Sequence, residues 1–317
     1  MDTAHFPSAS TRYRVSRSRG KQPGESLYIS KLRARRKDKG MARSSDESES
    51  DEELEQGWSH LKHVQAASFS TDRIGAIVLH QLFNRKVVLY PDNTVVKSGK
   101  RIAIGEADAL KVAEAAGIPA PAVHDAHTDS DGVKHIRMSY IEGETLDKLW
   151  PDLPAEKKSG VARQLRVILE EMRSVTPPPN FVGACDGTQI RDTRLHFTYH
   201  APFCTNEKSF NEYLLSSLYE QTPPVLREAF SRRLRTDHRI VLSHCDLTPR
   251  NILVHDGKVK GIIDWEDSGW YPAYWEFVKF FLRPAERGWK EYAEEIFPEL
   301  YQDELVDLIA ISKWQND

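Results

Sequence analysis

The sequence predicts an α+β fold, with a small β-rich part followed by a larger and mostly helical part. Two apolar runs flank a Pro-Asp-Asn turn within residues 86–97, as is typical of a β-hairpin. Residues 252–263 predict a second hairpin, because its centre is Asp-Gly and both turn positions must tolerate positive φ. Apolar residues at helical spacing fill residues 155–173, which predicts a long amphipathic helix.

The 317 residues are 39% hydrophobic with a formal net charge of −3, enough for a substantial core in one two-lobed domain or two small ones. This nearly neutral balance predicts no nucleic-acid partner. No apolar run approaches the roughly 20 residues of a membrane span, so no membrane partner is expected. Three widely spaced cysteines without Cys-x-x-Cys predict a reducing compartment, without a disulfide framework or zinc site. We therefore expect a cytoplasmic protein.

Residues 1–60 differ in kind from the rest of the chain. Twelve Lys or Arg residues lie between Arg12 and Arg43, and residues 44–53 are almost wholly acidic and serine. Such charge blocks with few apolar residues predict a disordered tail, which is a candidate protein-binding segment. The basic cluster at residues 31–37 leaves nuclear localisation as an alternative, and the Arg- and Ser-rich start leaves a mitochondrial presequence as another.

The β-rich part is expected to begin with a short helix over residues 74–82, where apolar residues recur. The hairpin of residues 86–97 follows, and Lys97 ends its second strand. A further helix is predicted over residues 105–116, because Gly117 suits the left-handed position that ends helices.

Glu106 lies on the apolar face of this second helix, since it shares helical spacing with Leu110 and Ala113. A carboxylate on that face requires a cation, and Lys97 is the natural candidate. The alternative is that Glu106 and Lys97 are two independent surface charges.

The segment after this helix alternates like a strand over residues 136–143 and ends in a turn. The larger part of the chain then holds the long helix of residues 155–173. A loop-rich stretch is expected over residues 181–203, followed by a helix that begins near Phe210.

The passage with the most chemical content is Ser-His-Cys-Asp-Leu-Thr-Pro-Arg-Asn, residues 243–251, with Asp264 just after the second hairpin. Phosphoryl transfer requires a carboxylate that accepts a hydroxyl proton, and an Asn and an Asp that hold Mg²⁺. Asp246 and Asn251 have the spacing of the His-x-Asp-x-x-x-x-Asn catalytic loop of protein kinases. Because a hairpin returns the chain to its start, Asn251 and Asp264 are expected close enough to share one metal. The alternative is that these side chains cap turns or helices.

Residues 243–276 resemble the aminoglycoside phosphotransferase (APH) family of small-molecule kinases, in Ser-His-x-Asp-Leu-x-Pro-x-Asn-Ile-Leu-Val and in Ile-Ile-Asp-Trp-Glu. The continuation Asp-Ser-Gly-Trp-Tyr-Pro-Ala-Tyr-Trp-Glu resembles its fungal small-molecule kinase-like members. The resemblance implies a two-lobed protein-kinase-like fold, with an N-lobe at residues 70–143 and a C-lobe at residues 144–317. Protein kinases proper carry Asp-Phe-Gly and an activation segment, which do not fit here, so a small hydroxylated acceptor is expected.

The resemblance also implies the roles of individual residues. Asp246 would be the catalytic base, while Asn251 and Asp264 would bind Mg²⁺. Lys97, held by Glu106, would bind the α- and β-phosphates of ATP. The segment between the lobes would bind adenine through Met138, Ser139, Tyr140 and Ile141. The alternative for that segment is an ordinary strand.

The sequence departs from related patterns at two places, and two further residues have alternative roles. No glycine occurs between Gly75 and Gly99, so the Gly-x-Gly-x-x-Gly phosphate cover of protein kinases is absent. Cys245 stands where the family commonly has glycine, either as a small residue that fits or as a reactive thiol. Arg250 is a candidate phosphate ligand or half of a surface ion pair, and Trp270 either packs in the core or stacks on a substrate.

Together these patterns predict an ATP- and Mg²⁺-dependent phosphotransferase that moves the γ-phosphate to a hydroxyl of a small molecule. An aminoglycoside acceptor is not favoured, because the region that would meet its ammonium groups holds few acids: Asp186, Asp192, Glu207 and Glu212. Two alternatives are a nucleotide-binding scaffold without useful catalysis and a protein kinase that docks through the charged tail. The scaffold is disfavoured because all five key polar residues are present: Lys97, Glu106, Asp246, Asn251 and Asp264. The protein kinase is disfavoured by the lack of an activation segment.

Overall fold

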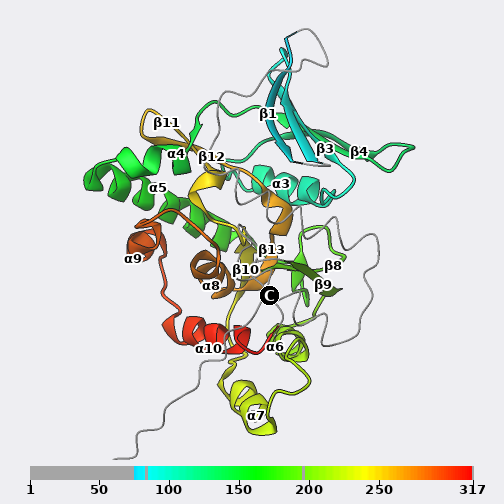
Figure 1. Ribbon diagram of the computed structural model, residues 1–317, viewed down its shortest axis with the longest axis vertical. Coiled ribbons are helices and arrows are strands. Elements are labelled where there is room, and N and C mark those ends of the chain that lie inside the picture. Colours follow the sequence, from blue (N-terminus) through cyan, green and yellow to red (C-terminus); the bar gives the residue numbers. More distant parts are fainter. Residues whose placement is uncertain (1–74, 83–84, 195–196, 316–317) are drawn as a thin grey trace, which may run out of the picture. The chain divides into compact units, whose positions relative to one another are not determined.

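A computed structural model describes residues 75–82, 85–194 and 197–315, all within the compact unit Leu61–Asp317. The predictions for residues 1–60 lie outside this described part. Within it, no helix is long and apolar enough to cross a membrane. The structure confirms an α+β fold, in which a β-sheet region precedes a largely helical region (Figure 1).

The first region is a five-stranded antiparallel sheet in the order β1-β2-β3-β5-β4. Its strands are β1 Ile77–Leu82, β2 Arg85–Leu89, β3 Thr94–Gly99, β4 Val123–Thr128 and β5 Lys134–Ser139. Helix α3, Glu106–Ala115, buries Ala107, Leu110 and Ala113 in the same core as Ile136 of β5. Gly117 follows with a φ of +71°, so it ends the helix as expected.

The predicted helix over residues 74–82 is wrong, because residues 77–82 form strand β1. The apolar side chains that suggested a helix are largely exposed: Ile77, Leu79 and Leu82. Backbone pairing with β2 determines the structure of this segment. Apolar residues at helical spacing do not make a helix where no face of it would be buried.

The second region contains five longer helices around three small sheets. The helices of the region are α4 Leu146–Leu149, α5 Ala155–Ser174, α6 Glu207–Ser216, α7 Pro224–Arg233, α8 Trp275–Leu282, α9 Ala293–Ile296 and α10 Gln302–Ser312. The strands are β6 Glu144–Thr145, β7 Gly183–Ala184, β8 Gln189–Thr193, β9 Thr198–Pro202, β10 Ile240–Ser243, β11 Ile252–His255, β12 Lys258–Ile262 and β13 Gly269–Pro272. Short 3-10 turns are η2 Trp150–Asp152, η3 Pro249–Asn251, η4 Trp265–Asp267 and η5 Trp289–Tyr292.

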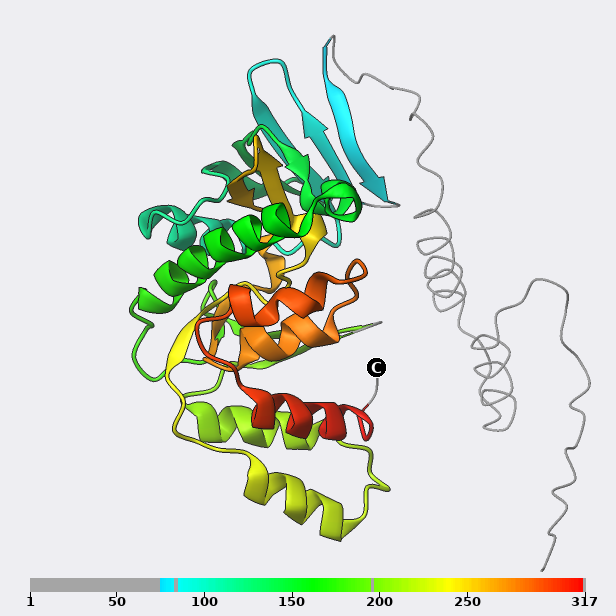
Figure 2. The same ribbon diagram turned by 90° about the vertical axis from the view of Figure 1, so that its left-hand side faces the viewer.

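Helix α5 is the longest helix of the described residues and lies on the side of the region nearest the five-stranded sheet (Figure 2). It buries the apolar stripe that predicted it, with Val161, Leu165, Ile168, Leu169 and Met172 in the main core. It contacts β10, β12 and α9, so it supports the strand before the predicted catalytic loop and the second strand of the hairpin after it. The prediction of this helix is confirmed.

The expectation of a loop-rich stretch at residues 181–203 is wrong. Strands β8 and β9 form a hairpin there, and β7 joins β13 in the sheet β10-β13-β7. The strand pattern was hidden because the inward-facing residues of β8 include Asp192, which is buried with Lys279 of α8. A buried charge interrupts the alternation of apolar and polar residues from which strands are recognised.

Candidate active site

The β11–β12 hairpin brings Asn251 and the residues after Ile262 to the same end of the sheet. Ile252 pairs with Ile262, and the Ile263 N–H donates to the Asn251 carbonyl at 2.9 Å. The turn at the opposite end has Asp256 at φ +51° and Gly257 at φ +72°. Positive φ at both central residues is the geometry that Asp-Gly predicts for a two-residue hairpin turn. Local turn geometry therefore places Asp264 beside Asn251.

Asp264 has a backbone φ of +64°, a left-handed conformation that is uncommon outside glycine. Its carboxylate makes no capping hydrogen bond to η4, so helix capping does not explain the residue. One oxygen accepts a hydrogen bond from Lys97 at 2.6 Å, and the side chain is 30% exposed. No described residue donates to the other oxygen, which leaves it available for a ligand.

Lys97 links the two regions of the structure. Its Nζ donates to Glu106 Oε2 and to Asp264 Oδ1, both at 2.6 Å, although these residues lie on α3 and after β12. Glu106 is only 2% exposed, on the buried face of α3. The predicted Lys97–Glu106 ion pair is confirmed, and the alternative of independent surface charges is wrong.

The electrostatics of this group depend on burial and on the central ammonium. Burial alone would lower the pKa of Lys97, but Asp264 and Glu106 raise it above its usual value, so Lys97 is a permanent cation. Burial raises the pKa of Glu106 to about 7, although Lys97 opposes this shift. For Asp264 the influence of Lys97 exceeds that of burial, and the pKa of this carboxyl lies well below its ordinary value.

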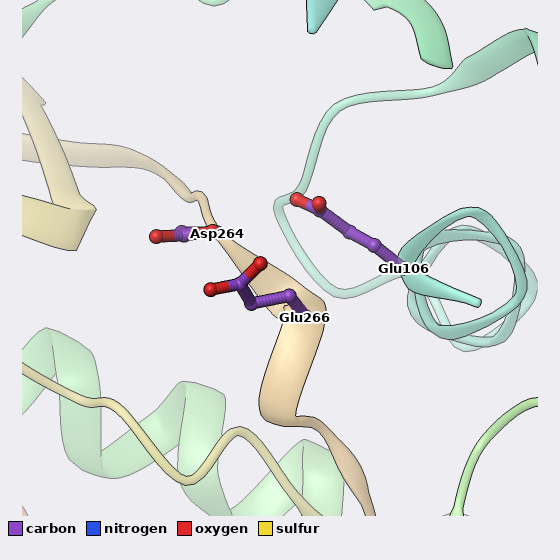
Figure 3. Close-up of side chains that lie close together, drawn as sticks. All are labelled: Glu106, Asp264 and Glu266. Carbon is purple, nitrogen blue, oxygen red and sulfur yellow. The ribbon is translucent and has the colours of Figure 1, made fainter. Parts of the chain in front are cut away.

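Glu266 and Arg85 belong to the same cluster, and sequence reasoning missed both. Carboxylate oxygens of Glu106, Asp264 and Glu266 lie within 4.8 Å of one another, as α3 and η4 pack together (Figure 3). Arg85, at the start of β2, donates to Glu266 at 2.7 Å. Two features of the sequence could have pointed to them. Glu266 is an acid two residues after Asp264, and Arg85 is a basic residue in the segment where protein kinases carry the glycine-rich loop.

A cavity of about 1150 Å³ opens beside this cluster, between the five-stranded sheet and the β11–β12 hairpin. The predicted site residues that line it are Lys97, Glu106, Met138, Ser139, Tyr140, Ile141, Asn251 and Asp264. Apolar wall residues include Val87, Val95 and Leu149. A cavity of this size with convergent polar groups at one end is typical of a ligand site. Asp246 does not line it.

The loop that carries Asp246 is held by a buried carboxylate. Glu276 of α8 accepts hydrogen bonds from the backbone N–H groups of His244 and Cys245 through one oxygen. The His244 ring lies between the Asp246 N–H, at 3.3 Å, and the Ile263 carbonyl, at 3.1 Å. His244 therefore fixes the loop to the segment that ends in Asp264.

Asp246 itself lies between two arginines. Its two oxygens accept hydrogen bonds from one nitrogen of Arg250, at 2.8 and 2.6 Å, and Arg283 lies 3.6 Å away on its other side. The Asn251 amide donates to the Asp246 carbonyl at 3.0 Å, which orients that side chain. The structure thus places Arg250 in an ion pair with the predicted catalytic residue.

Two further residues now have a structural role. Cys245 is 1% exposed and has a φ of +67°, a left-handed conformation that favours glycine. Burial raises the pKa of its thiol well above the usual value, which favours the small packed residue over a reactive thiolate. Trp270 is buried in the core and does not present a surface for stacking.

A network of buried charges connects the β8–β9 hairpin to α8 and η4. Asp267 accepts hydrogen bonds from Arg191, Thr193 and Arg283. Asp192 is paired with Lys279 and with Arg194. Burial alone would raise the pKa of Asp192, but Lys279 and Arg194 bring it to about 2.

The β-sheet region, the helical region and the polar cluster beside the cavity define a protein of kinase-like fold. A family model described as the phosphotransferase enzyme family (APH) matches residues 99–304, and the chain belongs to this family. The family predicted from residues 243–276 is therefore confirmed. No curated protein matches the chain.

One solved structure shows the same fold at low sequence identity, and two others are more weakly similar. The apo form of a thermostable mutant of aminoglycoside phosphotransferase APH(4)-Ia is 17% identical, with a TM-score of 0.54, covering 74% of this chain and 83% of that one. The GDP and kanamycin complex of APH(2")-IIIa is also 17% identical, with a TM-score of 0.49, covering 82% and 88%. The streptomycin–ATP complex of APH(2")-IIa is 17% identical, with a TM-score of 0.49, covering 85% and 87%.

Proposed function

We propose that the protein transfers the γ-phosphate of ATP to a hydroxyl group of a small molecule. The observation that carries this proposal is the position of Lys97, which is held at 2.6 Å by both Glu106 and Asp264 at the polar end of a large cavity. Membership of a phosphotransferase family supports it independently.

In this proposal the sheet region, within residues 70–143, binds the nucleotide, and residues 144–317 supply the catalytic loop and the acceptor site. Adenine lies against the segment Met138–Ile141, where backbone groups of Ser139 and Ile141 recognise the base. Lys97 binds the α- and β-phosphates, and its position is fixed by Glu106. Arg85 lies over the same end of the cavity, where a glycine-rich loop would otherwise cover the phosphates.

The oxygen ligands at this end of the cavity fit a Mg²⁺ ion. Asp264 has a carboxylate oxygen without a donor among the described residues, and the Asn251 amide nitrogen is engaged with Asp246, so its carbonyl oxygen is available. Carboxylate and amide oxygens are the hard ligands that Mg²⁺ prefers. When bound there, Mg²⁺ would neutralise negative charge on the phosphate oxygens.

The reaction follows from this arrangement. The acceptor oxygen forms a bond to the γ-phosphorus, the bond between that phosphorus and the β–γ bridging oxygen breaks, and ADP leaves. The hydroxyl proton passes to the Asp246 carboxylate, which Glu276 and His244 hold in place through the loop backbone. Positioning and electrostatics supply the catalysis, without a covalent intermediate.

The acids near the acceptor side do not favour an aminoglycoside. Asp192 is buried with Lys279, and Glu207 is buried with His238, so neither is free to bind an ammonium group. The proposal is tested by calorimetric titration with Mg·ATP, followed by an ADP-release assay with a panel of neutral, acidic and amino-substituted alcohols. Binding and acceptor-dependent ADP release support it, while absence of Mg·ATP binding contradicts it.

A further inference from the structure

We propose that Arg250 is a ligand of the γ-phosphate, and that its movement to the nucleotide uncovers Asp246 for the acceptor hydroxyl. This inference rests on the proposed phosphotransferase function. It assigns a phosphate-binding role to a residue that the structure places in an ion pair with Asp246.

The first support is the way Arg250 covers Asp246. The Asp246 side chain is 11% exposed, whereas the Arg250 side chain is 45% exposed and donates to both carboxylate oxygens. The guanidinium therefore lies on the solvent side of the carboxylate. Movement of Arg250 would therefore open more of the Asp246 carboxylate to an acceptor hydroxyl.

The second support is the place of Arg250 relative to the cavity. Among the described residues, Arg250 alone both lines the cavity and hydrogen-bonds the Asp246 carboxylate. Its neighbour Asn251 and the cation Lys97 line the same cavity. Arg250 thus lies between the groups that are proposed to bind the phosphates and the group that accepts the proton.

The third support is its donor capacity. Arg250 uses one terminal nitrogen for Asp246, and the other makes a long contact of 3.5 Å with the Pro284 carbonyl. No hydrogen bond from its Nε to a described residue exists. A guanidinium has five N–H donors in a fork that matches phosphate oxygens, so Arg250 has donors to spare for a phosphate.

The fourth support is that Asp246 does not lose its only cation when Arg250 moves. Arg283 stays 3.6 Å from the carboxylate and is itself fixed by Asp267 and by the Cys245 carbonyl. A buried carboxylate without a cation is strongly destabilising, and Arg283 prevents this cost. The exchange of partners by Arg250 is therefore energetically accessible.

The test compares two nucleotides that differ in the γ-phosphate. Mg·ADP and Mg·AMP-PNP, a non-hydrolysable triphosphate, are titrated into the full chain by calorimetry. We expect Arg250→Ala to weaken Mg·AMP-PNP about 10- to 100-fold, the effect of a lost charge-assisted hydrogen bond, and Mg·ADP by less than about twofold. Arg250→Lys keeps the charge without the forked donors of the guanidinium, and it should give an intermediate loss of Mg·AMP-PNP affinity. It replaces the alanine variant if that variant does not fold.

The matched control is Arg232→Ala, which removes an exposed arginine from a surface pair with Glu228 on α7, and it should change neither affinity. Equal weakening of both nucleotides by Arg250→Ala, or no weakening of either, overturns the role of Arg250 and leaves the proposed function standing. Failure of the unmodified protein to bind either nucleotide overturns the proposed function itself, and this inference with it.

Discussion

Two polar clusters meet at the candidate active site, and they differ in the balance of their charges. In the first, at the end of the cavity, three carboxylates share two cations: Glu106, Asp264 and Glu266 with Lys97 and Arg85. In the second, around Asp246 and the β8–β9 hairpin, five cations share three carboxylates: Arg191, Arg194, Arg250, Lys279 and Arg283 with Asp192, Asp246 and Asp267. Arg191 also lies 3.7 Å from Glu266, so it joins the two clusters. The excess of acid in the first cluster suits the proposed Mg²⁺, whereas of the five cations in the second cluster only Arg250 borders the cavity.

The two clusters also differ in the role of their charged residues. Lys97, Asp264 and Arg85 border a cavity, so their partners can change when a ligand binds. Asp192 and Lys279 are almost completely buried and satisfied by each other, so they hold the β8–β9 hairpin against α8. A strongly shifted pKa occurs in both regions, which shows that the shift alone does not identify the functional residues.

Asp246→Ala should have the largest effect on the reaction, because it removes the proton acceptor. We expect acceptor-dependent ADP release to fall by about 10³- to 10⁴-fold at saturating Mg·ATP. Calorimetric Mg·ATP affinity should stay within about threefold, because Asp246 does not line the cavity. A loss of Mg·ATP binding as great as that of an Asp264 variant would contradict the separation of the two roles.

Asp192→Ala should have the largest effect on stability. The substitution leaves Lys279 buried without its carboxylate, so we expect the free energy of unfolding to fall by about 3 kcal/mol or more in urea titrations. Glu212→Ala, an exposed acid on α6, is the matched control and should cost less than about 0.5 kcal/mol. Similar values for both variants would show that the buried network is not a structural one.

Asp264→Ala should affect nucleotide binding and much less the fold. Loss of the proposed Mg²⁺ ligand should weaken Mg·ATP about 10- to 100-fold by calorimetry. ATP measured without Mg²⁺ should be affected much less, because the proposed role is in holding the metal. Glu142→Ala, an acid at the cavity edge, is the control and should change Mg·ATP affinity by less than about twofold. Equal losses with and without Mg²⁺ would argue against Asp264 as a metal ligand.

The smallest expected effect is a pH dependence of stability from Glu106. Its pKa rises from 4.5 to about 7 in the folded protein, so the folded state keeps a proton that the unfolded chain releases. The stability that this proton provides is complete below the unfolded pKa and is lost as the pH rises through the folded value. Relative to Glu106→Gln, the wild-type free energy of unfolding should therefore fall by about 1–3 kcal/mol between about pH 5 and about pH 8. A constant difference would show that Glu106 stays ionised.

The features that the sequence predicted well are those determined by short-range geometry. The Asp-Gly turn places Asn251 and Asp264 at one end of a hairpin, and helical spacing places Glu106 on the buried face of α3. The Lys97–Glu106 pair was predictable because few residues separate it and one buried acid requires one cation. These relations depend on local backbone periodicity, which the sequence records directly.

Strand β1 and the β8–β9 hairpin were not predictable in this way. Strand β1 exists because β2 pairs with it, and its own apolar residues remain largely exposed. The hairpin depends on the burial of Asp192 against Lys279, whose position in the sequence is far from it. Both structures are stabilised by partners, so the local pattern was misleading.

The sequence by itself determined the phosphotransferase family, the loop that we propose to be catalytic and the hairpin that joins Asn251 to Asp264. Only the tertiary structure decided that Arg85 meets Glu266 and that Arg250 and Arg283 enclose Asp246. The ion-pair partner of a charged side chain cannot be predicted from the sequence, because a long flexible side chain can pair with any opposite charge that folding brings near. Packing of the two regions makes that choice, and it is the choice on which the function proposed for Arg250 depends.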